Sequence, residues 1–364
     1  MSFLLSYLIE SLNLMAKDYN NTEQVHVNKI KIKIENLFKI FGPKAREFTE
    51  VVKQGVDKDE LLAKHNHVLG LDNINLDIHD QSIQVVMGLS GSGKSTLIRH
   101  VNRLIDPTEG VVSVDDQDVT KLSKDELLEF RRTKTGMVFQ RFGLFPHQNI
   151  IENVKLGLSI KGIDKSEADE TAMYWIDKVG LNGFEFKFPN QLSGGMQQRV
   201  GLARALATNP DILLMDEAFS ALDPLIRSDM QDQLLELQKN LKKTIMFITH
   251  DLDEALKLGD SIAILNGGKL VQNGKPEEIL LNPADDYVTK FVQDVNRAKV
   301  LKVKSIMKDS HQLTEGPKVN MNASIESCLP TILETRAELG VVDDDDNLIG
   351  SISDKEVANI LRNN

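Results

Sequence analysis

Residues 88–96 have the residue types and the spacing of a loop that binds phosphate. The run GLSGSGKST fits the pattern G-x-x-x-x-G-K-[ST]. Its glycines let the backbone curl so that successive N–H groups face inward around an anion. Lys94 has the reach for the β- and γ-phosphates of a nucleotide, and the Ser95 hydroxyl can ligate Mg²⁺. The residues expected to contact the nucleotide are Gly88, Ser90, Gly91, Ser92, Gly93, Lys94, Ser95 and Thr96.

The chain on either side of this loop supports the interpretation. An apolar, strand-like run at residues 83–87 precedes it, and a helical pattern at residues 97–102 follows it. A helix that begins at the loop adds the positive end of its dipole to the anion site. The alternative is a Gly/Ser-rich turn that binds nothing, and the strand–loop–helix context argues against it.

A second glycine motif, LSGGMQQR at residues 192–199, predicts another phosphate-facing loop at the start of a helix. One chain does not need two such loops for one phosphate group, but two copies facing head to tail do. Each ATP would then lie between the Lys94 loop of one copy and the Ser193 loop of the other. The alternative is a capped helix after a glycine turn. The residues expected to face the partner's ATP are Ser193, Gly194, Gly195 and Gln197.

Asp216 and Glu217 follow a continuous apolar run at residues 212–215. Such a run suits a strand buried on both faces of a parallel sheet. Two carboxylates at its end would be costly inside a core, but ligands bind at the carboxyl edge of such sheets. We expect Asp216 to hold Mg²⁺ and Glu217 to act as general base toward the attacking water. The alternative is an acidic helix cap after a strand.

Three more polar residues complete this set. Gln140 follows an apolar run and is expected to touch Mg²⁺ and water, while His250 follows residues 244–249 and could hydrogen-bond the γ-phosphate. Asp223 lies a few residues beyond Glu217. Taken singly, each is an ordinary solvated loop residue, so the information lies in their order along the chain.

In that order the motifs resemble the nucleotide-binding domain of an ATP-binding-cassette (ABC) transporter, over about residues 29–285. The resemblance implies an α/β fold of the P-loop NTPase class, with a parallel-sheet core, an antiparallel β subdomain and a helical subdomain. It implies a homodimer with two ATP and Mg²⁺ sites at the interface, and it places Asp223 at that interface. It also implies that Phe41 stacks on adenine; the alternative is a core phenylalanine on a strand.

A long segment separates Phe41 from the strand before the phosphate loop. Residues 44–55 and 57–64 both have helical spacing, with Asp57 as N-cap and Glu60 as its capping-box partner. This insertion and the run at residues 101–110 resemble the ATPase subunits of glycine-betaine/proline-type osmoprotectant importers. That resemblance implies separate membrane permease subunits, a solute-binding protein or domain, and a peripheral location at the cytoplasmic face of the cell membrane.

The resemblance also implies a coupling region after Gln140. Residues 141–150 form an apolar surface run, and a helical subdomain follows with a periodic stretch from residue 165 to 179. In the family this region receives a short helix of the membrane subunit. For Phe142, Leu144 and Phe145 the alternative is packing within the domain.

Composition agrees with this interpretation. The chain has 364 residues, with 41% hydrophobic and 27% charged residues and a formal net charge of −11, and no broad basic stripe indicates nucleic-acid binding. The lone Cys328 suits a reducing cytosol. No run approaches the roughly 20 apolar residues of a membrane span. Residues 3–15 are either an amphipathic surface helix or a dispensable extension, with Met15 as an alternative start.

The chain changes character near Asn296. A helix, a strand with Gly-x-Val-Val-Asp, an acidic turn, a second strand and a final helix resemble one CBS repeat, with residues 300–307 as lead-in strand and helix. Such repeats normally pair, so this tail is a regulatory nucleotide sensor, a dimerisation element or a remnant. Asp343 and Asp354 are the candidate ribose or base contacts, and residues 343–346 are expected to form a solvated turn.

The expected organisation is an extension at 1–28, an ABC nucleotide-binding domain at 29–295 and a small α+β CBS-like domain at 296–364. The expected function is an ATPase that powers import of a small osmoprotectant of the glycine betaine, proline, carnitine or choline class. Two alternatives stay open: import of another small solute, and a soluble ABC ATPase without a transport role.

Overall fold

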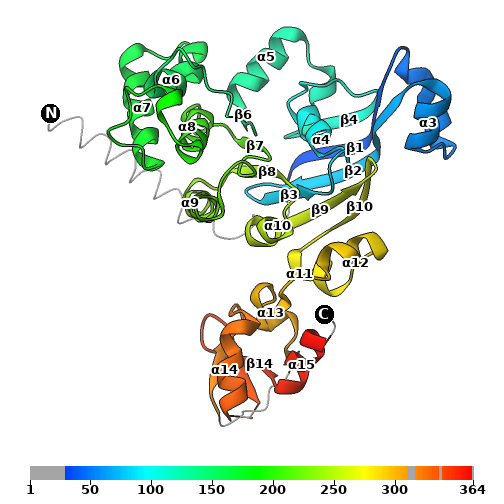
Figure 1. Ribbon diagram of the computed structural model, residues 1–364, viewed down its shortest axis with the longest axis vertical. Helices are drawn as coiled ribbons and strands as arrows, with labels where there is room; N and C mark the ends of the chain where they lie inside the picture. The colour runs from blue at the N-terminus through cyan, green and yellow to red at the C-terminus, as the bar shows by residue number, and fades with distance from the viewer. Residues whose placement is uncertain (1–28, 141, 310–315, 336–337, 363–364) are drawn as a thin grey trace.

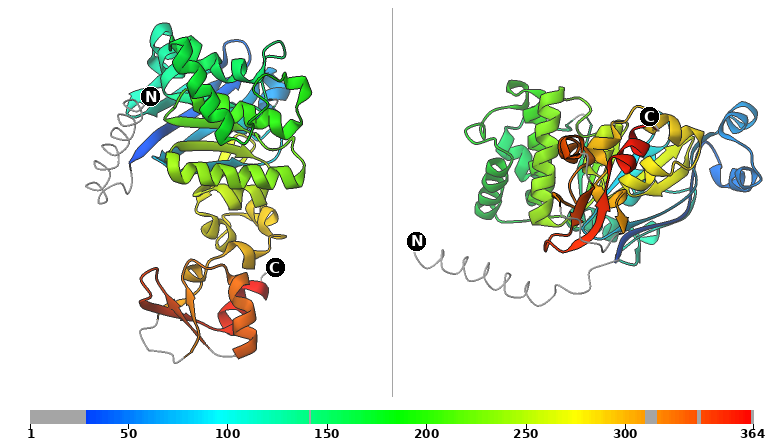
Figure 2. Two further views of the ribbon diagram at one scale, coloured as in Figure 1. Left: turned by 90° about the vertical axis from the view of Figure 1, so that its left-hand side faces the viewer. Right: turned by 90° about the horizontal axis from the view of Figure 1, so that it is seen from below.

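The computed structural model describes residues 29–140, 142–309, 316–335 and 338–362. A large body carries the phosphate loop, and a smaller C-terminal unit extends from one end of it (Figures 1 and 2). The residues 1–28, for which an amphipathic helix or an extension was expected, lie outside the described residues. Among the described residues, no helix has the length and apolarity needed to cross a membrane.

The body is built on a sheet with the strand order β10-β9-β3-β8-β7-β6, parallel except for β10. All residues of β3, β7 and β8 are buried, as expected for apolar strands covered on both faces. Because the phosphate loop and both carboxylates follow such strands, they meet at one edge of this sheet. The strands are β3 (Ile83–Met87), β6 (Thr135–Val138), β7 (Ile212–Asp216), β8 (Thr244–Thr249), β9 (Ser261–Asn266) and β10 (Lys269–Gly274).

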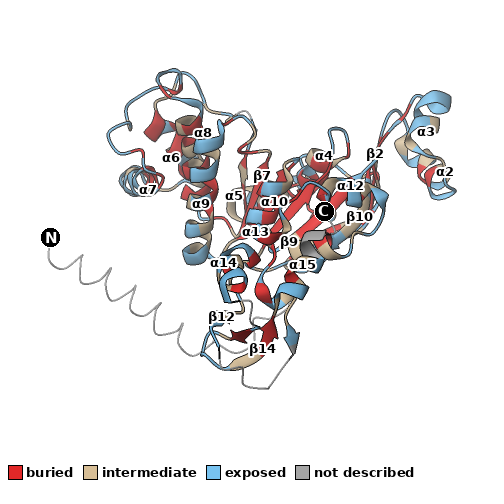
Figure 3. Ribbon diagram, turned by 60° about the horizontal axis from the view of Figure 1, so that its bottom comes forward, coloured by how far each residue is buried: buried red, intermediate tan, exposed pale blue. Residues whose placement is uncertain are grey.

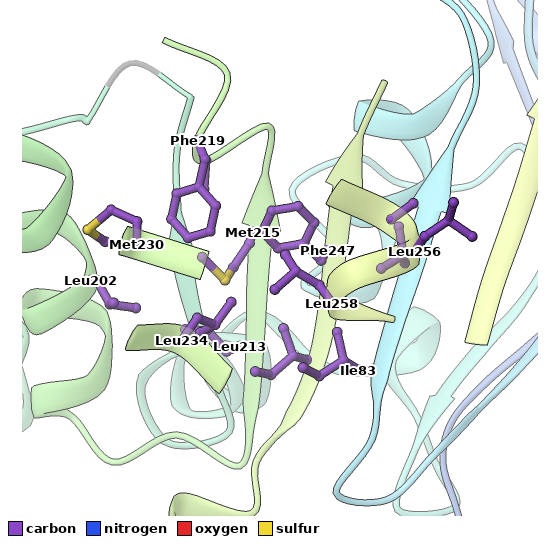
Figure 4. Packing of buried hydrophobic residues seen from close by; sticks show 14 of the residues in the cluster. Ile83, Leu202, Leu213, Met215, Phe219, Met230, Leu234, Phe247, Leu256 and Leu258 are labelled. Atoms are coloured by element: carbon purple, nitrogen blue, oxygen red, sulfur yellow. The ribbon is translucent and has the colours of Figure 1, made fainter. Parts of the chain in front are cut away.

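Helices cover this sheet on both faces. Figure 4 shows one side of the core, where Phe219 and Phe247 pack with Met215 and Met230. The ring centroids of Phe219 and Phe247 are 5.5 Å apart. The helices are α4 (Lys94–Val101), α9 (Pro224–Leu241) and α10 (Leu252–Leu258).

A second, antiparallel sheet has the order β2-β1-β4-β5. Its apolar face packs on α4 and on the far face of the main sheet, in one core that includes Ile34, Val86 and Leu97. Its elements, with the short helices that follow, are β1 (Ile30–Phe41), β2 (Val68–His79), β4 (Glu109–Val114), β5 (Gln117–Asp118), η2 (Val119–Lys121) and α5 (Lys124–Thr133).

A helical subdomain lies on the other side of the body (Figure 1). Its first helix begins at a capping box in which Asn149 and Glu152 each accept the other's backbone N–H. The elements are α6 (Ile150–Lys161), α7 (Lys165–Lys178), η3 (Pro189–Gln191) and α8 (Gly194–Ala207). The sequence motif at residues 192–199 therefore opens α8.

The insertion forms η1 (Ala45–Phe48), α2 (Thr49–Lys53) and α3 (Lys58–His65), which project beside the β1–β2 hairpin (Figure 3). Asp57 caps α3 as expected, accepting the Glu60 N–H at 2.8 Å. The prediction of a complete capping box is wrong, because the Glu60 carboxylate pairs with Lys64 at 2.5 Å instead of accepting the Asp57 N–H. An i,i+4 lysine competes directly for a glutamate in the first helical turn.

The C-terminal elements have the order expected for the tail, with one correction. Helix α14, strand β13, an acidic turn, strand β14 and helix α15 follow one another, but residues 300–307 hold a helix end and a 3-10 turn rather than a lead-in strand. The strands that precede α14, β11 and β12, begin only at residue 308. The elements are α11 (Pro276–Leu281), α12 (Asp286–Val292), α13 (Arg297–Val300), η4 (Val303–Ser305), β11 (Lys308–Asp309), β12 (Lys318–Asn320), α14 (Ile325–Thr335), β13 (Leu339–Val342), β14 (Leu348–Ile352) and α15 (Asp354–Arg362).

Helix α13 joins the tail to the body through a shared core. Val292 and Val295 belong to the same cluster of buried residues as Ala298 and Leu301, and the cluster continues to Ile325 in the tail. The tail sheet has the order β11-β14-β13-β12. The two parts therefore share apolar packing as well as a chain connection.

Acid is expected to destabilise the fold through His100, a residue of α4 that is 1% exposed. Burial lowers the pKa of this imidazole from 6.5 to about 4. Below pH 6.5 the unfolded chain takes up a proton that the folded chain does not, so stability falls as pH falls toward 4. Chemical denaturation at pH 7 and pH 5 should show a loss about 2 kcal/mol larger in wild type than in His100→Gln. Equal losses in the two proteins would contradict this assignment.

Candidate active site

The phosphate loop follows β3 directly and opens α4. Gly88, Gly91 and Gly93 have φ of 148°, 76° and 103°, values that residues with side chains rarely adopt. Lys94 is buried, and its Nζ donates to the carbonyls of Gly88 at 2.7 Å and Leu89 at 3.1 Å. Burial lowers the pKa of Lys94, and the neighbouring Glu217 and Asp216 carboxylates oppose that effect.

The loop fits a phosphate ligand on its own geometry. The Ser92 hydroxyl is buried and has no hydrogen-bond partner, a cost that a phosphate oxygen would remove. A Cβ at Gly88 would lie 2.2 Å from the Leu265 carbonyl, and one at Gly93 would lie 2.6 Å from the Gly70 carbonyl. The glycines are therefore required by neighbouring backbone as well as by their own dihedral angles.

Asp216 ends β7 and lies against the start of α4. Its Oδ1 accepts the Ser95 hydroxyl at 2.7 Å, and its Oδ2 pairs with Arg99 at 3.2 Å. A hydroxyl next to a carboxylate is the oxygen donor set that Mg²⁺ prefers, so Ser95 and Asp216 fit the ion. The third expected ligand, Gln140, directs its amide elsewhere in this structure.

Glu217 is the point at which the other polar residues meet. Its Oε2 accepts the Gln140 amide at 2.9 Å and lies 3.7 Å from the His250 ring, while its Oε1 lies 3.9 Å from the Lys94 ammonium. Glu217 has a φ of 46°, and its N–H donates to the Ile248 carbonyl of β8. Such strained non-glycine residues concentrate at functional sites. The structure therefore brings together residues that are far apart in sequence.

Two residues of this cluster, Ser220 and Arg99, were not among those predicted from the sequence. The Ser220 hydroxyl accepts from the Gln140 amide at 3.4 Å and donates to the Glu217 backbone carbonyl at 2.9 Å, so it links the Gln140 side chain to the Glu217 main chain. Arg99 neutralises Asp216 from the exposed side of α4. Sequence spacing could have indicated both residues. Ser220 lies three positions after Glu217, and Arg99 lies four positions, or one helical turn, after Ser95.

The LSGGMQQR motif is separate from the phosphate loop within one copy. Ser193 caps α8 by accepting the Met196 N–H at 3.3 Å, and both Ser193 and Gly194 are exposed. A Cβ at Gly195 would lie 2.4 Å from Ile226 of α9, so this glycine is needed for helix packing. In Figure 1, α8 lies in the helical subdomain and α4 beside the main sheet. The exposed motif is thus free to face another molecule.

Phe41 ends β1 and is 39% exposed, which rules out a core role. Its ring lies over Gly70 of β2, where a Cβ would be 2.7 Å from the ring, and the Lys39 ammonium is 4.9 Å from the ring centroid. The Gly70 carbonyl in turn borders Gly93 of the phosphate loop. A cavity of about 560 Å³ also opens beside Phe41, but it is lined by residues from the segments 39–47 and 106–108 and by none of the phosphate loop. An exposed aromatic face next to the loop suits a nucleotide base.

Hydrogen bonds connect this site to the helical subdomain. Arg204 of α8 donates to the carbonyls of Phe142 and Gly143 in the loop after Gln140. Asn153 is fully buried and bonds to Phe145, Gln148 and Asn149. Arg204 therefore ties α8 to residues 142 and 143, which lie two and three positions after Gln140. Phe145 is 40% exposed, whereas Leu144 packs on the main core.

The Arg227 side chain connects the residue before Asp223 to the residue after His250. Asp223 caps α9, and Arg227 in the same helix donates to the Leu222 carbonyl at 3.1 Å. The other arm of Arg227 pairs with Asp251 at 3.2 Å. The start of α9 and the chain after β8 are therefore held together by one side chain.

The two candidate residues of the tail have other surroundings. Both oxygens of Asp343 are used inside the β13–β14 turn, where they accept from Asp345 and Asn347. These bonds lower the pKa of Asp343. Asp354 is the first residue of α15 and is exposed. The acidic run is the solvated turn that was expected.

The fold and this site define a P-loop ATPase, and comparison with known proteins gives the family. The family model described as ABC transporter matches residues 71–220. A relative named glycine betaine transport ATP-binding protein OpuAA, from Bacillus subtilis, is 50% identical over 91% of this chain and 81% of its own length. The chain belongs to the ABC transporter family, as an ATP-binding subunit that is an ATPase.

Other relatives and structures agree. The glycine betaine/proline betaine transport system ATP-binding protein ProV of Escherichia coli is 51% identical over 76% of this chain and 69% of its own length. A solved dimer of the ATP-binding cassette MJ0796 with ADP and phosphate shares 34% identity, with a TM-score of 0.58. That similarity covers 67% of this chain and 98% of the cassette.

Proposed function

We propose that this chain powers the import of a small osmoprotectant of the glycine betaine, proline, carnitine or choline class through separate membrane subunits. The convergence of Lys94, Gln140, Glu217 and His250 at one sheet edge carries the ATPase part of the proposal. The solute class is supported by the names of the relatives that match over most of the chain.

Hydrolysis would proceed by in-line attack of water on the γ-phosphorus. Glu217 accepts a proton from the water while the water oxygen forms a bond to the γ-phosphorus. The bond between the γ-phosphorus and the β–γ bridging oxygen breaks, and ADP leaves. Lys94 and the loop N–H groups stabilise the charge on the phosphates. His250, 3.7 Å from Glu217, would contact the γ-phosphate. Most of the rate enhancement comes from positioning and charge stabilisation.

Mg²⁺ would be held by Ser95 and Asp216, with Gln140 as a further ligand after its amide turns away from Glu217. When bound, the ion supplies positive charge to the β- and γ-phosphate oxygens. Phe41 would hold the adenine by stacking.

A homodimer would complete each site with the partner's Ser193 loop. The exposed Ser193 and Gly194 support this arrangement. Closure would move the helical subdomains together and switch the membrane subunits through the loop that Arg204 and Asn153 hold.

The surroundings of the ATPase follow from the same proposal. The chain would lie at the cytoplasmic face of the membrane as a peripheral subunit, with permease subunits and a solute-binding protein or domain as partners. Residues 29–295 would form the ABC domain. Residues 296–364 would form a CBS-like unit that senses a nucleotide or supports dimerisation. The proposed function requires no nucleic-acid partner.

Reconstitution tests this function directly. The chain would be co-expressed with candidate permease subunits from the same organism, placed in lipid vesicles, and assayed for phosphate release with and without glycine betaine. We expect stimulation by betaine that is absent in Glu217→Gln. Hydrolysis that ignores betaine but responds to another solute would transfer the assignment to that solute. Failure to assemble with any membrane subunit would favour an ABC ATPase without a transport role.

A further inference from the structure

The insertion, residues 42–67, forms a compact unit next to the phosphate loop. Val52 of α2 and Leu61 of α3 are buried against Phe38, Ile40 and Leu69 of the β1–β2 hairpin in a small core of their own. The helices are therefore fixed to the strand that ends at Phe41. Any polar group they present to the nucleotide site is held in place by this packing.

Lys58, the first residue of α3, contacts the phosphate loop. Its Nζ donates to the Gly91 carbonyl at 3.2 Å, and the residue is half-buried. Of the nearby carboxylates, Asp57 caps the helix and Glu60 pairs with Lys64. Across the described residues, no carboxylate lies within ion-pair distance of Lys58, although Asp57 and Asp59 flank it in sequence. The insertion thus places at the loop an ammonium group that has no direct ion pair.

The contacted carbonyl belongs to a peptide unit of the phosphate loop. The Gly91 carbonyl accepts from Lys58 at 3.2 Å, and the Ser92 N–H of the same peptide donates to the Leu89 carbonyl, also at 3.2 Å. A cation on the oxygen of a peptide polarises it and strengthens the N–H as a donor. A phosphate oxygen that replaced the Leu89 carbonyl would then accept from this stronger donor.

We propose that Lys58 is an ATP-positioning residue, which acts through the Gly91–Ser92 peptide and adds positive charge beside the phosphates. This proposal rests on the ATP-binding function of the loop. It gives the insertion a role in ATP binding that is separate from the roles of the phosphate loop, the strand-end residues and the LSGGMQQR motif. The rival explanation is that Lys58 only ties α3 to the body.

The experiment measures ATP affinity of the full-length chain with Mg²⁺, by titration with a fluorescent ATP analogue. Lys58→Met retains the aliphatic stem without the charge, Lys58→Arg retains the charge, and Lys64→Ala is the matched control on the same helix. We expect Kd to rise about five-fold in Lys58→Met and to stay within about two-fold of wild type in Lys58→Arg and Lys64→Ala. The difference between Lys58→Met and wild type should shrink in 0.5 M salt, since the charge acts partly through solvent.

Two results would overturn the proposal while leaving the ATPase function intact. One is unchanged ATP affinity in Lys58→Met. The other is an equal loss in Lys64→Ala and Lys58→Met that persists at high salt, together with a lower unfolding temperature, since that pattern means a purely structural tie. A wild-type chain that binds no ATP would overturn the proposed function itself, and Lys94→Ala supplies the reference for lost binding.

Discussion

Glu217→Gln is expected to lower kcat for ATP hydrolysis by about 10²- to 10³-fold while ATP still binds. Glutamine has the same shape and can still accept the Gln140 amide, which lies 2.9 Å from Oε2 of Glu217. It cannot take a proton from water. Loss of the negative charge near Lys94 should also strengthen binding of the nucleotide. ATP should therefore hold two copies together.

Phosphate release and size-exclusion chromatography with ATP and Mg²⁺ measure the two effects. Glu236→Gln, an exposed position on α9, is the control for loss of a carboxylate. It should hydrolyse ATP at the wild-type rate and elute as wild type does. Wild-type turnover in Glu217→Gln would remove Glu217 from the role of general base.

A mixture of two inactive variants is expected to regain ATPase activity if the sites are shared between copies. Lys94→Ala removes the buried ammonium of the phosphate loop, and Ser193→Arg removes the α8 cap and places a bulky side chain at an exposed loop. Each alone should lose about 100-fold or more of its activity. In a head-to-tail dimer of the two, both defects fall in one site and the other site is intact.

Random mixing gives up to about a quarter of the wild-type sites, a signal well above either variant alone. Lys94→Ala mixed with Glu217→Gln is the matched control, because these residues serve the same half of a site and no intact site can form. Activity that returns in neither mixture would mean that Ser193 acts within its own chain. Activity that returns in both would exclude shared sites of this geometry.

The motifs and their placement could be predicted because each one ends or begins a regular element. Asp216 and His250 lie where buried strands stop, and Lys94 begins the helix after another such strand. Parallel strands bring these positions to one edge of the sheet. The N-caps Asp57, Ser193 and Asp223 have a purely local cause and could equally be predicted. Residue roles in the reaction remain predictions that the variants above test.

Contacts between distant segments could not be predicted in the same way. The Gln140 amide meets Glu217 across 77 positions, and Lys58 meets Gly91 across 33. Neither partner follows from residue type or local spacing, since many amides and lysines in the chain are equally suited. Local competition explains one error, because Glu60 pairs with Lys64 instead of completing the capping box. The other error lies at the start of the tail, where the chain forms the short helix α13 and a 3-10 turn instead of a strand.

The shared core across α13 has a practical consequence for experiments on regulation. A chain cut at residue 295 would lose Ala298 and Leu301, which belong to the same buried cluster as Val292 and Val295. The newly exposed apolar surface would lower the solubility and stability of the truncated ATPase, independently of any ligand that the tail binds. Deletion of the tail is therefore a stability mutation as much as a regulatory one. Substitutions on the tail's own surface, such as Asp354→Ala, separate the two effects.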